Sequence, residues 1–166
     1  MRRQINSEEL AILYNKIGQA IWFSQYLESA LAQYIVLKVL AKEVGEFTEA
    51  EANRHQVRLN KQPLGRLIAE AESLSVLDDI PLNRLRNFNE RRKWVVHNST
   101  REDGVELYTS EGRKSVFDRL ETFIHEAQDL HKFIGDQIVE YCVSRGKNKK
   151  TIYDDAEKHI AKLRGL

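Results

Sequence analysis

Cysteine, proline and glycine are all scarce in this sequence. A single cysteine among 166 residues, Cys142, excludes an internal disulfide framework and is typical of a reducing compartment, so we expect a cytoplasmic protein. Two prolines and eight glycines leave long stretches that a helix can occupy without interruption. Histidine and cysteine do not cluster at the spacing of a zinc site, so we expect no metal and no cofactor.

An excess of charge is also missing, since the formal net charge is only +1. No overall field therefore attracts nucleic acid, and any basic patch has to be local. The nearest approach to a membrane span, residues 30–41, is too short and contains Gln33 and Lys38, so we expect no contact with a membrane. No uninterrupted apolar stretch follows the first residues, and we expect no signal peptide.

Apolar residues at three- and four-residue intervals predict an all-α fold. We expect an up-and-down bundle of four to five main helices. The first helix should run from Ser7, as its N-cap, to about Val44, with Gly45 ending it. Its second half is apolar around most of its circumference, which indicates burial on more than one side.

The remaining helices are expected to be shorter, apart from the last. Their predicted ranges are 49–59 after a Thr48 cap, 63 to about 74, 78 to about 97, and 114–144. We interpret residues 99–112 as a loop, a small insertion in which residues 105–108 form one arm of a hairpin. The basic run at 145–150 is the candidate domain edge. It predicts a helical domain over 1–145 and a basic linker with a short C-terminal helix over 146–166.

An arginine pair and a His-Asn pair lie at the end of the helix expected from residue 78. We expect Trp94 to bury while Arg92 and His97 stay near solvent. A permanently charged guanidinium beside a titratable imidazole suits acid/base chemistry on a phosphodiester. Residues five apart on an ideal α-helix project roughly 140° from each other, so the two side chains would have to converge across a groove.

Three other features of the sequence are explained without a catalytic role. Arg119 and His125 repeat a similar spacing, but we interpret them as a solvated face with Glu121 and Glu126 as ion partners. Glu28, among apolar neighbours, either pairs with an arginine of the motif helix or faces water. Both tryptophans, the motif residue and Trp22, are expected in the core.

Residues 92–97 read RKWVVH and resemble the RxxxxH signature of HEPN domains. The long apolar first helix, the segment 61–68 and the glycine-containing insertion at 103–108 agree with this resemblance, which covers about residues 8 to 143. The resemblance implies a HEPN-like bundle. Many such domains are metal-independent RNases of toxin–antitoxin or antiphage systems that work as dimers, whereas others keep the fold without catalysis.

The resemblance therefore implies an endoribonuclease that cleaves single-stranded RNA by 2′-OH attack, as a toxin or an antiphage defence effector. His97 would be the acid or base and Arg92 would stabilise charge at phosphorus, while Arg91, Lys93 and Asn98 would bind substrate. Because one histidine cannot easily be both acid and base, we expect a homodimer. The expected partners are RNA, a second copy, and an antitoxin or neighbouring-gene protein.

Two alternatives remain open from the sequence. One is a non-catalytic HEPN-like module that binds a nucleotide, RNA or a protein partner. The other is a purely structural helical bundle. The alternatives share the expected fold, so only the local geometry of the motif can separate them.

Overall fold

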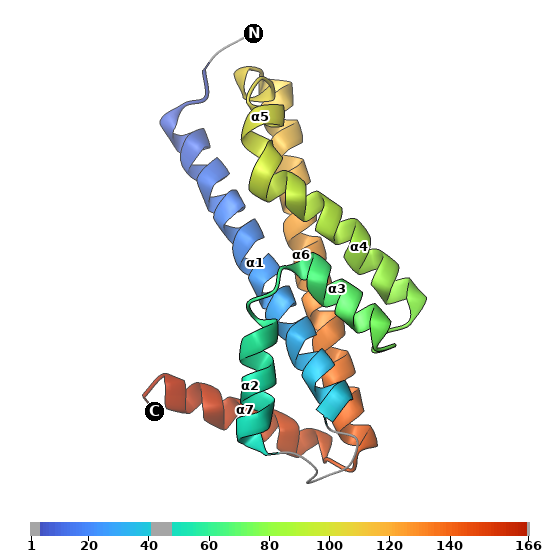
Figure 1. Cartoon of the computed structure of the whole chain (residues 1–166). Coiled ribbons are helices and arrows are strands. Elements are labelled where there is room, and N and C mark those ends of the chain that lie inside the picture. The colour runs from blue at the N-terminus through green and yellow to red at the C-terminus, as the bar shows by residue number, and fades with distance from the viewer. Residues whose placement is uncertain (1–3, 41–47, 166) are drawn as a thin grey trace.

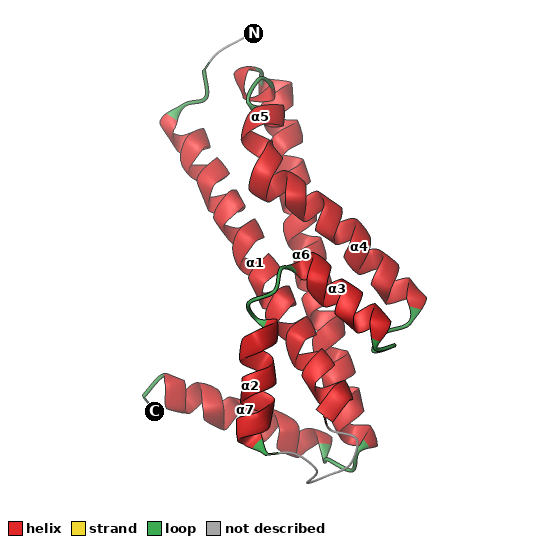
Figure 2. Ribbon diagram, viewed as in Figure 1, coloured by secondary structure: helices red, strands yellow, loops and turns green. Residues whose placement is uncertain are grey.

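The computed structural model describes residues 4–40 and 48–165, and these ranges are helical with no strand among them (Figures 1 and 2). The all-α prediction is therefore confirmed, at the level of a helical bundle. The helices are α1 (Ser7–Leu40), α2 (Glu49–Leu59), α3 (Leu64–Ser73), α4 (Asp79–Lys93), α5 (Ser99–Asp103), α6 (Ser110–Ser144) and α7 (Lys149–Leu163). None of the described helices is long and apolar enough to cross a membrane.

The two longest helices, α1 and α6, run parallel and side by side (Figure 1). Lys16 pairs with Glu121 at 3.3 Å, and further along both helices the ring of Tyr26 lies 5.9 Å from that of His131. Helix α4 runs in the opposite direction against α6, and α3 packs between α4 and α1. The motif at the end of α4 is thereby carried back toward the first half of α1.

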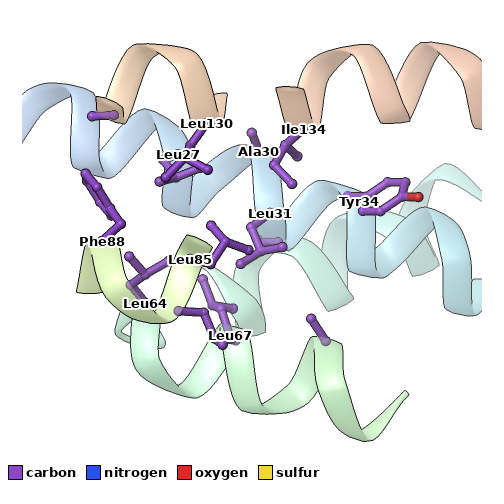
Figure 3. Close-up of a cluster of buried hydrophobic side chains, with 14 of the residues drawn as sticks. Leu27, Ala30, Leu31, Tyr34, Leu64, Leu67, Leu85, Phe88, Leu130 and Ile134 are labelled. Atoms are coloured by element: carbon purple, nitrogen blue, oxygen red, sulfur yellow. The ribbon is translucent and has the colours of Figure 1, made fainter. Parts of the chain in front are cut away.

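The core lies where α1, α3, α4 and α6 meet (Figure 3). Phe88 of α4 is fully buried and stacks on Phe123 of α6, with ring centroids 4.6 Å apart. Buried leucines from the same four helices make up much of this core: Leu27, Leu31, Leu64, Leu67, Leu85 and Leu130. The second half of α1 is buried on several sides, as its apolar circumference predicted, because α2, α3 and α6 all pack on it.

Caps define where two of the helices begin. Thr48 forms the predicted cap of α2, since its Oγ1 accepts the Glu51 N–H at 3.2 Å and its own N–H donates to the Glu51 carboxylate at 2.8 Å. The Ser7 cap of α1 is wrong by one residue. Asn6 takes that place, because its Oδ1 accepts the Glu9 N–H at 2.8 Å and Glu9 returns the contact at 3.1 Å. The expected end at Val44 and Gly45 lies outside the described residues.

The loop predicted over 99–112 is wrong. It contains α5 and a 3₁₀ turn (Glu106–Tyr108), and α6 begins at Ser110, four residues before the expected start. Apolar and polar residues alternate at 105–108 as they do in a strand. The Tyr108 N–H nevertheless donates to the Val105 carbonyl, three residues back, at 3.3 Å, which is the hydrogen bond of a 3₁₀ turn. The buried guanidinium of Arg113 donates to the Leu107 carbonyl at 2.9 Å, and this longer-range contact holds the turn.

Helix α7 extends from the end of α6 and has no buried residue (Figure 1). The connection is short. Gly146 has φ +86°, which turns the chain out of α6, and the Asn148 side chain accepts the Lys150 N–H at 2.8 Å to cap α7. The basic residues thus form a turn and the first residues of a helix.

Candidate active site at the end of the motif helix

A π-helical turn (Trp94–Asn98) follows directly on α4, so the motif histidine does not stand on a regular α-helix. The Ser99 N–H donates to the Trp94 carbonyl, five residues back. A π turn holds more residues than an α turn, so residues five apart diverge less than the roughly 140° expected on an ideal α-helix. Val95 is buried beneath the turn, and His97 is exposed to solvent. Single π turns occur often at functional sites.

The sequence predicted that Arg92 stays near solvent. The structure shows it mostly enclosed, with 21% of its side chain exposed. Its Nη2 lies 2.9 Å from Oε1 of Glu28, which is itself 17% exposed. Of the two interpretations of Glu28, pairing with a motif arginine is therefore confirmed. The same Oε1 accepts the Leu64 N–H, the first of α3, at 3.1 Å. One carboxylate thus joins α1, α3 and α4 and complements the positive end of the α3 dipole.

The contact with Glu28 does not satisfy every donor of the Arg92 guanidinium. Its Nε–H is buried and has no acceptor within the part of the chain that the structure describes. An unsatisfied buried donor of this kind costs about 1–3 kcal/mol. Among the described residues, Glu28 is the ion partner of this guanidinium. Glu28 is therefore the residue that fixes the orientation of this arginine.

The other three predicted site residues face different partners. Arg91 turns toward α6 and pairs with Glu126. The exposed Lys93 lies 2.7 Å from Glu90. The side chain of Asn98 accepts from Arg101 at 3.3 Å. The structure therefore does not gather the predicted substrate-binding residues around Arg92; it spreads them around the end of α4.

Arg119 has different ion partners from those expected. It pairs with Asp103 at 2.7 Å and with Glu106 at 2.9 Å, and its guanidinium carbon lies 4.9 Å from the centre of the Trp94 ring. Glu126, the partner expected for this segment, belongs to Arg91 instead. His125 is exposed, in agreement with the solvated face predicted for it.

A buried carboxyl beside the motif was not predicted from the sequence. Asp103 is buried against the π turn, and burial raises the pKa of its carboxyl, although the Arg119 guanidinium acts in the opposite direction. Its Oδ2 and the Trp94 Nε1 are both buried, and neither reaches a hydrogen-bond partner in the described ranges. The nearby indole N–H of Trp94 acts, like Arg119, to lower the pKa of Asp103, but burial is the larger effect. Asp103 was missed because it lay in a predicted loop.

A hollow of about 700 Å³ opens between α4 and α6 on the Arg119 side of the motif. Its lining combines the aromatic and the charged side chains Trp94, Phe123, Arg91, Lys114, Arg119, Glu111 and Asp118. Its lining includes neither Arg92 nor His97. The motif therefore has two sides: an ion-paired arginine toward α1, and toward α6 a hollow lined by aromatic residues and by side chains of both charges.

The described residues contain no group of three or more His, Cys, Asp or Glu side chains placed to hold a metal ion. No protein-family model, no curated protein and no solved structure matches this chain. The contacts of the motif are therefore the observations from which a function can be argued.

Proposed function

We propose that this protein is a metal-independent endoribonuclease that cleaves single-stranded RNA by attack of its own 2′-OH. The observation that carries the proposal is the exposed His97 on a π turn, five residues after an arginine whose orientation Glu28 fixes. RNA supplies the nucleophile, so the protein needs only proton transfer and charge stabilisation. The product would be a 2′,3′-cyclic phosphate.

The proposed roles follow from the chemistry of each side chain. The His97 imidazole takes the proton of the 2′-OH or gives one to the leaving 5′-oxygen. Arg92 stabilises the charge on the oxygens at phosphorus through the donors that Glu28 leaves free. Glu28 is a positioning residue, because it touches the arginine and not the RNA.

One imidazole serves poorly as both acid and base in the same turnover. A two-fold dimer that brings two motif segments near its axis supplies the second imidazole. We propose that the dimer acts as a toxin or antiphage effector of the HEPN type, in the cytoplasm, restrained by an antitoxin or another neighbouring-gene protein. The RxxxxH resemblance is the support for this biological role.

The test compares three variants on a labelled single-stranded RNA. His97→Ala should abolish cleavage, and Arg92→Lys should lower it by about 10²-fold or more, because a lysine keeps the charge but loses the planar fork. His125→Ala is the matched control, an exposed histidine on another helix, and should cleave like the wild type. Cleavage by His97→Ala at the wild-type rate would refute the proposal.

A second candidate function has an observation in its favour. Arg92 is mostly enclosed, and its contact with Glu28 joins three helices, which is sufficient reason for an arginine at this position. On this account the protein is a non-catalytic helical module that binds a nucleotide, RNA or a protein. The module would bind single-stranded RNA in a fluorescence anisotropy titration while leaving it intact, and His97→Ala would change neither result.

A further inference from the structure

The hollow between α4 and α6 adjoins the π turn, yet no step of the proposed cleavage uses it. Its volume of about 700 Å³ lies within the range of roughly 300–1,000 Å³ that ligand pockets occupy. Trp94, the first residue of the π turn, lines the hollow, and His97 stands three residues further on in the same turn. A group of the substrate that enters the hollow therefore belongs to a nucleotide close to the phosphodiester at His97.

The basic residues that line the hollow already have acidic partners. Arg91 pairs with Glu126. Lys114 pairs with Asp118, one turn further along α6. Arg119 pairs with two carboxylates at once. A phosphate is held by cations that neutralise its charge, and the charges of these cations are already balanced within the chain. The hollow therefore suits an uncharged part of the RNA better than the phosphate backbone.

Arg119 presents a fixed, planar surface to this hollow. Its Nη2 lies 2.7 Å from Oδ1 of Asp103 and 2.9 Å from Oε2 of Glu106. Its guanidinium carbon lies over the Trp94 ring, 4.9 Å from the ring centre, and 42% of the arginine side chain is still exposed. Two carboxylates and an indole thus hold the guanidinium in place, and the side turned away from the indole is open. Unpaired RNA bases stack on guanidinium planes of this kind.

We propose that an unpaired RNA base beside the cleaved phosphodiester enters the hollow and stacks on the guanidinium of Arg119. The inference rests on the proposed function and names the part of the substrate that this side of the motif binds. A base in a regular duplex is already stacked on both sides, whereas an unpaired base is free to enter. Because its partners already fix Arg119, stacking costs little of the side-chain freedom that binding otherwise removes. The Ser115 hydroxyl in the lining can form a hydrogen bond with the edge of the base.

The test separates the contribution of the bases from that of the phosphates. The full chain with His97→Ala, which leaves RNA intact, is titrated by fluorescence anisotropy into a labelled single-stranded RNA and into an abasic ribose-phosphate oligomer of the same length. The RNA should bind about 10- to 100-fold more tightly than the abasic oligomer. Adding Arg119→Lys keeps the charge but removes the plane. This change should weaken RNA binding about tenfold and leave the affinity for the abasic oligomer unchanged.

The matched control is Arg58→Lys. Arg58 is also an exposed arginine 2.7 Å from a carboxylate, that of Glu70, but it lies on α2, away from the motif (Figure 1). Its replacement should change neither affinity. A second measurement keeps Arg119 intact and uses Trp22→Phe, which leaves Trp94 as the one tryptophan of the chain. The prediction that Trp22 lies in the core is wrong, because it is 59% exposed, so this replacement should leave the fold unchanged. The Trp94 fluorescence should change on addition of RNA and not on addition of the abasic oligomer.

Circular dichroism checks that each variant is folded. RNA that binds no more tightly than the abasic oligomer, or a Trp94 fluorescence that RNA leaves unchanged, would overturn the base site. A folded Arg119→Lys that weakens both oligomers equally would overturn it too, because the arginine would then act through its charge alone. RNA that binds as expected but stays intact with the wild-type chain would leave the base site standing and remove the endoribonuclease. Cleavage by the wild-type chain without any contribution from the bases would do the reverse.

Discussion

Glu28 is the residue on which the arrangement of the motif depends most, and its neutral isostere tests that dependence. In Glu28→Gln the side chain keeps its shape and can still accept the Leu64 N–H. The substitution removes the charge that faces Arg92 at 2.9 Å. A guanidinium that is 21% exposed is then left without its counter-ion.

The magnitude follows from the burial of the pair. Removing one partner of a fully buried ion pair costs about 3–5 kcal/mol. An exposed pair is worth about 0–1 kcal/mol. With 17% and 21% of the two side chains exposed, we expect an intermediate loss of about 2 kcal/mol in the free energy of unfolding. For a chain of this length such a loss lowers the melting temperature by about 4–8 °C.

Urea denaturation followed by circular dichroism measures this loss. The matched control is Glu90→Gln, which breaks the pair with Lys93, where the glutamate side chain is 70% exposed, and should cost less than about 0.5 kcal/mol. If Glu28→Gln were as stable as Glu90→Gln, the contact would not hold the three helices together. The argument that Glu28 orients Arg92 would then lose its basis.

Three further predictions concern caps, burial and the reaction. Thr48→Ala should cost about 1 kcal/mol and speed amide exchange in the first turn of α2, whereas Thr122→Ala, on an exposed part of α6, should stay within about 0.5 kcal/mol of the wild type. Burial raises the pKa of the Asp103 carboxyl, so its contribution to stability is present below its ordinary pKa of 3.8 and is lost as the pH rises through the raised value. Asp103→Asn should therefore be at least as stable as the wild type at pH 7, and a loss above about 1 kcal/mol in urea denaturation would show that the pair with Arg119 outweighs burial. The rate of RNA cleavage should follow a bell-shaped pH profile, because one imidazole must be neutral and the other protonated, and a flat profile would count against two-histidine catalysis.

The long helices could be predicted because apolar residues recur in them every three or four positions, a pattern that is visible in a short stretch of sequence. The apolar stripe of α1 and the Thr48 cap of α2 both depend on residues close in the sequence, and both are found as expected. The pairing of Glu28 with an arginine of the motif helix could also be anticipated as one of two options, since a carboxylate among apolar neighbours requires either a partner or water.

The segment between the motif and α6 could not be predicted in the same way. The alternation at 105–108 suggested a strand, but the segment forms a 3₁₀ turn whose Leu107 carbonyl accepts from Arg113, a buried side chain of the next helix. The π turn has no sequence signature, so the expected divergence of Arg92 and His97 assumed an α-helix. Trp22 was placed in the core because of its size, although its position opposite the buried Leu27 stripe was readable from the sequence.

The most direct test of the proposed function is cleavage of a 5′-labelled single-stranded RNA by the purified chain in EDTA, with analysis of the new ends. The proposal predicts a 2′,3′-cyclic phosphate, no cleavage by His97→Ala, and no cleavage of the corresponding DNA. An intact RNA would contradict the account, as would DNA cut as readily as RNA. An activity that EDTA abolishes and Mg²⁺ restores would contradict it equally.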